Sequence, residues 1–153
     1  MRKNDKLKNF TNYKMDSEVY KLRRKVINLI YELKNEGLQL PRIDVRIGEN
    51  KNCNVLGTGK LHGNIIWITK KAVVKSENYL RNVVYHELLH TIYGCEHDET
   101  CPIMCSSLNK VISKNKCLQI FKNYYKKYNN IKQMEVAWIM KVKNIKNIKR
   151  DKE

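Results

Sequence analysis

Three histidines and one glutamate fall within residues 86–97, at spacings that suit a metal site. His86 and His90 are four residues apart, so on a helix both imidazoles project from one face and can reach the same ion. Glu87 is rotated from that face by about 100° and stays close enough to act on a water molecule bound to the metal. Three neutral imidazoles with a fourth position open to water describe a catalytic zinc site, which we predict at His86, His90 and His97.

The third histidine follows a glycine that can reverse the chain. Gly94 tolerates the left-handed conformation that ends many helices, and such an ending would fold His97 back toward the ion. The pattern can also arise by chance on an amphipathic helix, with the histidines as half-buried surface residues. Three of the four histidines lie in this one stretch, which favours the metal site. Glu96 and Asp98 are the alternative third ligands.

These residues resemble part of a known family. The segment from His86 to His97, followed by Asp98 and by Cys101-Pro102-Ile103-Met104, is similar to the zinc helix and Met-turn of the metzincin metallopeptidases, whose motif is HExxHxxGxxH. In this chain three residues separate His90 from Gly94, where the family has two, so the exit from the helix differs.

The resemblance extends over residues 65–128 and implies roles for individual side chains. By that resemblance His86, His90 and His97 are zinc ligands, Glu87 is the general base, and Met104 forms a hydrophobic floor beneath the metal. A second group is also similar, the SprT and WLM type of zinc protease, whose strand-then-helix lead-in is like residues 64–90. Those proteases lack a Met-turn, so the metzincin resemblance is favoured.

Four of the five cysteines lie close to the predicted zinc site in sequence. Cys95, Cys101 and Cys105 crowd the segment after the zinc helix, and Cys117 starts the next predicted helix. Four thiolates could bind a second, structural zinc, as the cysteines of archaemetzincins do, although the spacing here does not match theirs. The alternative is that they are ordinary small core residues.

The composition is strongly basic, with 31 Lys and Arg against 15 Asp and Glu and a formal net charge of +16. Such a charge attracts nucleic acid, anionic membranes or acidic proteins, although a diffuse lysine excess is often only a solvated surface. The basic start is not followed by an apolar segment, and no apolar run reaches membrane-spanning length. We therefore expect a cytoplasmic protein with reduced thiols, and no disulfide framework.

Hydrophobic spacing predicts the elements that must position the site. We expect strands at residues 43–47, 54–61 and 65–69, a turn at 48–52, and helices at 18–36, 77–93 and 114–128. Asp16 or Ser17 can cap the first helix and Ser76 the second. The first helix has an apolar stripe formed by Val19, Leu22, Val26, Leu29, Ile30 and Leu33.

Two predicted strands carry specific expectations. The metzincin resemblance implies that strand 65–69 lines the cleft and pairs with an extended substrate, whereas its composition alone equally suits a buried strand. Gly57 and Gly59 indicate a bulge or a backbone closely approached by another element. The sequence Gly57-Thr58-Gly59-Lys60 lacks the full spacing of a phosphate-binding loop. His62 is expected in an exposed turn.

Three regions are predicted: a flexible segment 1–15, a metallopeptidase domain 16–128 and a basic amphipathic extension 129–153. The extension carries Ile131, Met134, Trp138, Val142 and Ile145 at helical spacing with lysines between them. Such a helix can lie on a membrane or a partner, or pack on its own domain.

Together these features predict an α+β, zincin-like fold, with a small twisted mixed sheet, a backing helix, the zinc helix and a C-terminal helix. The expected function is that of a zinc metalloendopeptidase acting on peptide or protein substrates, with Glu87 as base and Tyr93 as a candidate oxyanion donor. Two alternatives stay open. One is a DNA-associated protease of the SprT or WLM kind. The other is a non-enzymatic basic nucleic-acid-binding module with a structural zinc.

Overall fold

We analysed a computed structural model of the chain, which describes residues 10–12, 16–51, 55–59, 63–108 and 110–151. Helices and strands are both present, so the protein is α+β, as the sequence predicts. In chain order the elements are β1 (Phe10–Asn12), α2 (Ser17–Asn35), β2 (Asp44–Asn50), β3 (Gly57–Gly59), β4 (Ile65–Thr69), α3 (Lys70–Val73), α4 (Glu77–Tyr93) and α5 (Lys114–Asp151). The chain divides into two compact units, Met1–Phe121 and Lys122–Glu153.

The strands form one mixed sheet in the order β1-β2-β4-β3. β2 and β4 are parallel, with Val45 opposite Ile66, while β1 and β3 pair antiparallel with their neighbours. β4 is therefore a central strand, bonded on both sides, and the expectation that it lines the cleft as an edge strand is wrong. Among the described strands, β3 occupies the edge beside β4.

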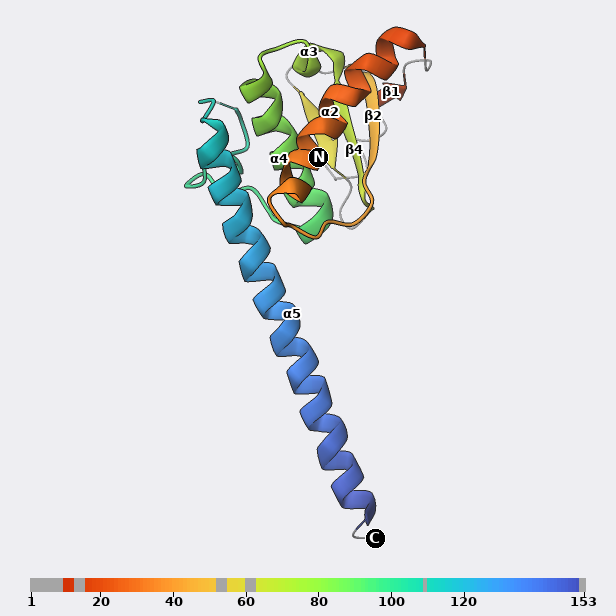
Figure 1. Cartoon of the computed structure of the whole chain (residues 1–153), viewed down its shortest axis with the longest axis vertical. Helices are drawn as coiled ribbons and strands as arrows, with labels where there is room; N and C mark the ends of the chain where they lie inside the picture. Colours follow the sequence, from red (N-terminus) through yellow and green to blue (C-terminus); the bar gives the residue numbers. More distant parts are fainter. Residues whose placement is uncertain (1–9, 13–15, 52–54, 60–62, 109, 152–153) are drawn as a thin grey trace. The chain divides into compact units, whose positions relative to one another are not determined.

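The core of the first unit lies between this sheet and two helices. α2 and α4 contact each other and both contact the sheet, so they cover the same face of it (Figure 1). In the parallel register Val45 and Ile47 of β2 lie beside Ile66 and Ile68 of β4, and all four side chains are buried. Burying this set against the helices removes each side chain from water at a gain of about 1.5–3 kcal/mol.

The backing helix α2 follows its predicted pattern closely. Asp16 caps it, because the Asp16 carboxylate accepts a hydrogen bond of 2.9 Å from the backbone N–H of Val19. The six predicted stripe residues are its buried residues. Gly37, with φ of 86°, adopts a left-handed conformation just after the helix, which is how many helices end.

The helix α4 also has the predicted ends. The Ser76 hydroxyl accepts a hydrogen bond of 3.2 Å from the N–H of Tyr79. At the other end Gly94 has φ of 64°, and its N–H donates to the carbonyl of His90 at 3.1 Å. The predicted core-facing residues Leu80, Val84 and Leu88 are buried.

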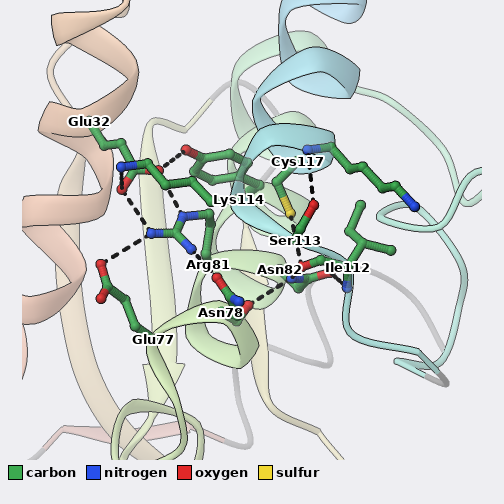
Figure 2. Close-up of polar contacts among 11 residues, drawn as sticks. Glu32, Glu77, Asn78, Arg81, Asn82, Ile112, Ser113, Lys114 and Cys117 are labelled. Atoms are coloured by element: carbon green, nitrogen blue, oxygen red, sulfur yellow. Dashed lines mark hydrogen bonds and ion pairs between the residues drawn. The ribbon is translucent and has the colours of Figure 1, made fainter.

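Arg81 anchors α4 to α2. Its guanidinium is almost fully buried and donates two hydrogen bonds to Glu32, at 2.7 Å to Oε1 and 3.0 Å to Oε2 (Figure 2). The Tyr85 hydroxyl donates to the same carboxylate at 2.9 Å. Burial by itself would raise the pKa of Glu32, but the bonds from Arg81 and Tyr85 outweigh it and hold that pKa below its usual value. Glu32 is thus an ionised partner for a buried cation.

Asn82, one residue further along α4, fastens the segment that leads into α5. Its side-chain NH₂ donates to the carbonyl of Ile112 at 3.1 Å, and its side-chain oxygen accepts from the N–H of Ile112 at 3.2 Å (Figure 2). Within the first unit, Phe121 packs edge-on against Tyr85 with ring centroids 5.3 Å apart. These contacts join α4 to the segment before α5 and to the start of that helix.

Four features differ from the predicted elements. β1 forms in the segment predicted to be flexible, by pairing with β2. β2 continues to Asn50, through residues predicted as a turn. The short helix α3 was not predicted, and is capped by the Thr69 hydroxyl. The C-terminal part forms one helix, α5, where two were expected.

Candidate metal centre

The three predicted histidines come together in the structure. The ring centroids of His86 and His90 are 4.6 Å apart, and the ring of His97 lies 5.2 Å and 4.8 Å from them. Each ring can offer one nitrogen, and these nitrogens all lie within 4.8 Å of one another. Among the described residues, this is the one group of three or more side chains that could hold a metal ion.

Two backbone carbonyls fix the orientation of the helical histidines. Nδ1 of His86 lies 2.6 Å from the carbonyl oxygen of Ile103, and Nδ1 of His90 lies 2.6 Å from that of Cys95. A carbonyl oxygen can only accept, so each Nδ1 must carry the proton and donate. In the neutral rings Nε2 is then left with a lone pair, which is the arrangement that metal-ligating histidines show.

The two Nε2 atoms face each other at 3.1 Å. Because both Nδ1 atoms are donors, two neutral rings would direct two lone pairs at each other, and neither could donate. A cation between them removes this repulsion. Two nitrogens on a tetrahedral zinc, at Zn–N distances of about 2.0–2.1 Å, are separated by about 3.3–3.4 Å. The observed separation is close to that value, so the histidine pair fits zinc.

The third nitrogen comes from His97, beyond the turn at Gly94. Of the two alternative ligands, Asp98 directs one of its carboxylate oxygens, Oδ1, to Thr100. It accepts from the Thr100 N–H at 2.9 Å and from the Thr100 hydroxyl at 2.6 Å, and these bonds lower the pKa of Asp98. Glu96 lines the same cleft but is not one of the three grouped side chains. With the extra residue before Gly94, the ring of His97 still lies beside those of His86 and His90.

Glu87 is buried in α4, and its Oε1 lies 3.5 Å from Nε2 of His86. The edge strand β3 packs directly on this part of the helix. A Cβ added to Gly59 would lie 2.5 Å from the Glu87 carbonyl oxygen, and one added to Gly57 would lie 3.2 Å from Glu87 Cγ. Of the two predicted causes for these glycines, close approach of another element is therefore confirmed. They belong to a strand and not to a phosphate-binding loop.

The histidines and Glu87 open into a cleft of about 700 Å³. One wall is the edge strand and the residues before it, another is α4, and a third is the loop that follows α4. Apolar side chains lining the cleft are Val55, Leu56, Val83, Ile103 and Leu108, and the polar ones include Lys71, Tyr79 and Asn82.

Sequence reasoning missed these three polar residues. Tyr79 and Asn82 precede His86 by seven and four residues, which is the spacing of one helix face, so that periodicity could have identified them. No local signal marks Lys71, because its place depends on how α3 packs. The predicted oxyanion donor Tyr93 does not line the cleft: its hydroxyl is buried, and its ring packs near Phe121 at 6.1 Å. We correct that assignment.

The loop after α4 is held as a series of turns. The N–H of Asp98 donates to the Met104 carbonyl at 2.9 Å, and the N–H of Cys105 donates to the Cys101 carbonyl at 3.1 Å. Met104 is fully buried, and the residue before it, Ile103, provides the carbonyl that orients His86. The segment predicted as a Met-turn is thus in contact with α4.

The four described cysteines form no disulfide with one another and do not gather into a second metal group. Cys117 is buried at the start of α5, and burial raises the pKa of its thiol to about 11. A thiol with that pKa stays protonated while no metal is bound to it. The predicted second zinc at Cys95, Cys101, Cys105 and Cys117 is therefore not supported. Cys53 and His62 lie outside the described residues.

Comparison of the chain with protein-family models, with characterised proteins and with solved structures gave no match. In the described part of the chain, none of the helices has both the length and the hydropathy needed to cross a lipid bilayer.

Proposed function

We propose that this protein is a zinc-dependent peptidase with a zincin-like fold. The observation that carries the proposal is the arrangement of α4. Two histidines on one face have their Nε2 lone pairs fixed toward each other by carbonyl acceptors, a third joins them after a glycine turn, and a buried carboxylate lies beside them. Three imidazoles leave a fourth position open to water, which distinguishes a catalytic from a structural zinc.

Glu87 would act as the base and then as the acid. Zinc, when bound, lowers the pKa of its water to about 7 and polarises a carbonyl oxygen. An oxygen of Glu87 takes the proton from the attacking water and delivers it to the amine that leaves, so the carboxylate ends the cycle unchanged. Its burial among β3 and α4 keeps that carboxylate in one position.

The substrate would enter along the edge of the sheet. β3 pairs with β4 on one side and lines the cleft, so in the described structure its other side is available to an extended peptide. A peptide added there would be an extra strand, with its main chain held near the histidines. The contact between the Met104 segment and His86 supports a metzincin-like arrangement over the SprT and WLM type.

The test separates metal binding from hydrolysis. In Glu87→Gln the amide keeps the shape and removes the base, so zinc content should stay at the wild-type level while hydrolysis of a denatured protein falls by about 10²–10⁴-fold. Glu77→Gln, the same exchange on an exposed residue at the start of the same helix, should leave the rate unchanged. Near-wild-type activity in Glu87→Gln would rule out the assigned base. Zinc binding without any hydrolysis in the wild type would favour the binding-module alternative, and cleavage stimulated by DNA the SprT or WLM type.

A further inference from the structure

The second compact unit, Lys122–Glu153, contains the C-terminal part of α5, and this helix exposes large apolar side chains. Met134 is 72% exposed, Trp138 66% and Met140 61%. Val136 and Ile139 are exposed as well. An apolar surface of this kind on a single helix marks a binding surface.

Five apolar residues of this helix form one stripe. Ile131, Met134, Trp138, Val142 and Ile145 follow one another at intervals of three and four residues, which keeps them on the same side of a helix. Gln133 and Asn144, two exposed polar residues, lie on the opposite side. The helix is therefore amphipathic over this length, although apolar side chains such as Met140 extend around it.

The charge of the unit limits what can cover the stripe. Residues 122–153 contain ten Lys or Arg and three Asp or Glu. A second copy of the same helix would carry the same excess of positive charge, and the two would repel each other. The partner should be anionic and should also accept large apolar side chains.

We propose that this helix binds an anionic lipid surface, lying in the plane of the membrane. The stripe would enter the boundary between headgroups and acyl chains, where tryptophan is favoured, and the lysines would remain among anionic headgroups. A DNA duplex satisfies the charge, but its phosphate backbone offers no apolar layer for aliphatic side chains such as Ile131 and Met134. Such binding would bring the first unit to the membrane and does not depend on what that unit catalyses.

Two charge-matched double variants of the full-length protein test the proposal. Ile131→Lys with Trp138→Lys adds two charges within the stripe, and Gln133→Lys with Asn144→Lys adds two charges on the opposite side. Sedimentation is measured with vesicles of phosphatidylcholine alone and of phosphatidylcholine mixed with phosphatidylserine. We expect the wild type and the opposite-side variant to bind the mixed vesicles. The affinity of the stripe variant for these vesicles should be lower by about tenfold or more.

A second readout uses the two tryptophans of the chain. Trp67 is buried in β4 at 8% exposure, so the emission that responds to lipid comes from Trp138. Mixed vesicles should shift that emission to shorter wavelength, and phosphatidylcholine alone should not.

Three results would overturn the proposal. If both double variants bound the mixed vesicles more tightly than the wild type and to the same extent, positive charge alone would account for the binding. Stronger binding to a DNA duplex than to the mixed vesicles would assign the helix to nucleic acid. Concentration-dependent dimerisation that the stripe variant loses, with no vesicle binding in the wild type, would assign the stripe to a second copy.

Discussion

Gly59 lies against the backbone of Glu87, so that a methyl group at Gly59 would stand 2.5 Å from the Glu87 carbonyl oxygen. The neighbouring atom is helix backbone, which cannot rotate away as a side chain can. The edge strand and the helix that carries the proposed base are therefore held at a separation that only glycine permits at this position.

Replacing Gly59 with alanine should push β3 away from α4. We expect a loss of about 1–3 kcal/mol in the free energy of unfolding, the usual cost of overpacking. The rate of peptide hydrolysis should fall by more than the loss of stability explains, because Glu87 would move with the helix relative to β3. Urea denaturation and peptide hydrolysis measure the two effects. Thr58→Ala, in the same strand, removes atoms from a buried side chain instead of adding them, so it distinguishes the cost of overpacking from the cost of any change in this strand. A Gly59→Ala protein as stable and active as the wild type would show that the contact is not limiting.

Single substitutions should distinguish the proposed zinc ligands from the neighbouring carboxylate. His86→Ala, His90→Ala and His97→Ala should each lower zinc content after dialysis, because two imidazoles hold zinc much less tightly than three. Asp98→Ala should keep the zinc, since its carboxylate is bonded to Thr100. The zinc content of each purified variant is measured by elemental analysis. Zinc retained in His97→Ala and lost in Asp98→Ala would reverse the assignment of the third ligand.

The pair Glu32–Arg81 should make stability depend on pH. The pKa of Glu32 is lower in the folded protein than its usual value of 4.5, so the stabilisation is present above pH 4.5 and is lost as the pH falls through the folded value. Glu32→Gln should cost about 3–5 kcal/mol at neutral pH, because the buried Arg81 loses the charge of its buried carboxylate partner, and should flatten the acid dependence.

Glu77→Gln is the matched control for that experiment. Glu77 also accepts a hydrogen bond from Arg81, at 3.1 Å, but its side chain is 76% exposed. Exposed ion pairs contribute about 0–1 kcal/mol, so this variant should unfold almost as the wild type does. Equal losses in the two variants, measured by urea denaturation from pH 3 to 7, would contradict the special role of Glu32.

The cysteines should not bind metal. We expect one zinc per chain under reducing conditions, and the same value in Cys101→Ser, because the described thiols do not converge. Cys117→Ser should lower stability without changing the zinc content, since it places a hydroxyl in a buried position. Two zinc ions per chain, falling to one in Cys101→Ser, would show that the cysteines do bind a second zinc.

Features determined by local sequence were predictable, and features determined by distant pairing were not. The ends of α4 depend on Ser76 and Gly94, which act within one helical turn, and the convergence of His86 and His90 follows from their spacing. The central position of β4 depends on which strands pair, and nothing within residues 65–69 encodes it. Similarly, Phe10–Asn12 becomes a strand only because β2 offers an edge.

The two helices predicted in the C-terminal part show a different limit of prediction from sequence, which is where a helix ends. Asn129 and Asn130 are weak helix formers, but neither glycine nor proline interrupts residues 114–151, so α5 continues through them. At the site, the sequence located Tyr93 correctly at the end of α4 but not the direction of its ring, which depends on packing with Phe121.

The metal centre also has a consequence for the order of folding. The contacts that shape it span short separations: four residues between His86 and His90, five from His90 to Cys95, and seventeen from His86 to Ile103. Arg81 and Glu32, by contrast, are 49 residues apart. Short loops close at lower entropic cost, so the ligand set can assemble before the sheet and its backing helix meet. Zinc present from the start of refolding should then accelerate the appearance of native fluorescence. Zinc added after refolding should leave that rate as it is in metal-free buffer. Equal rates in the two experiments would show that the ligands assemble late.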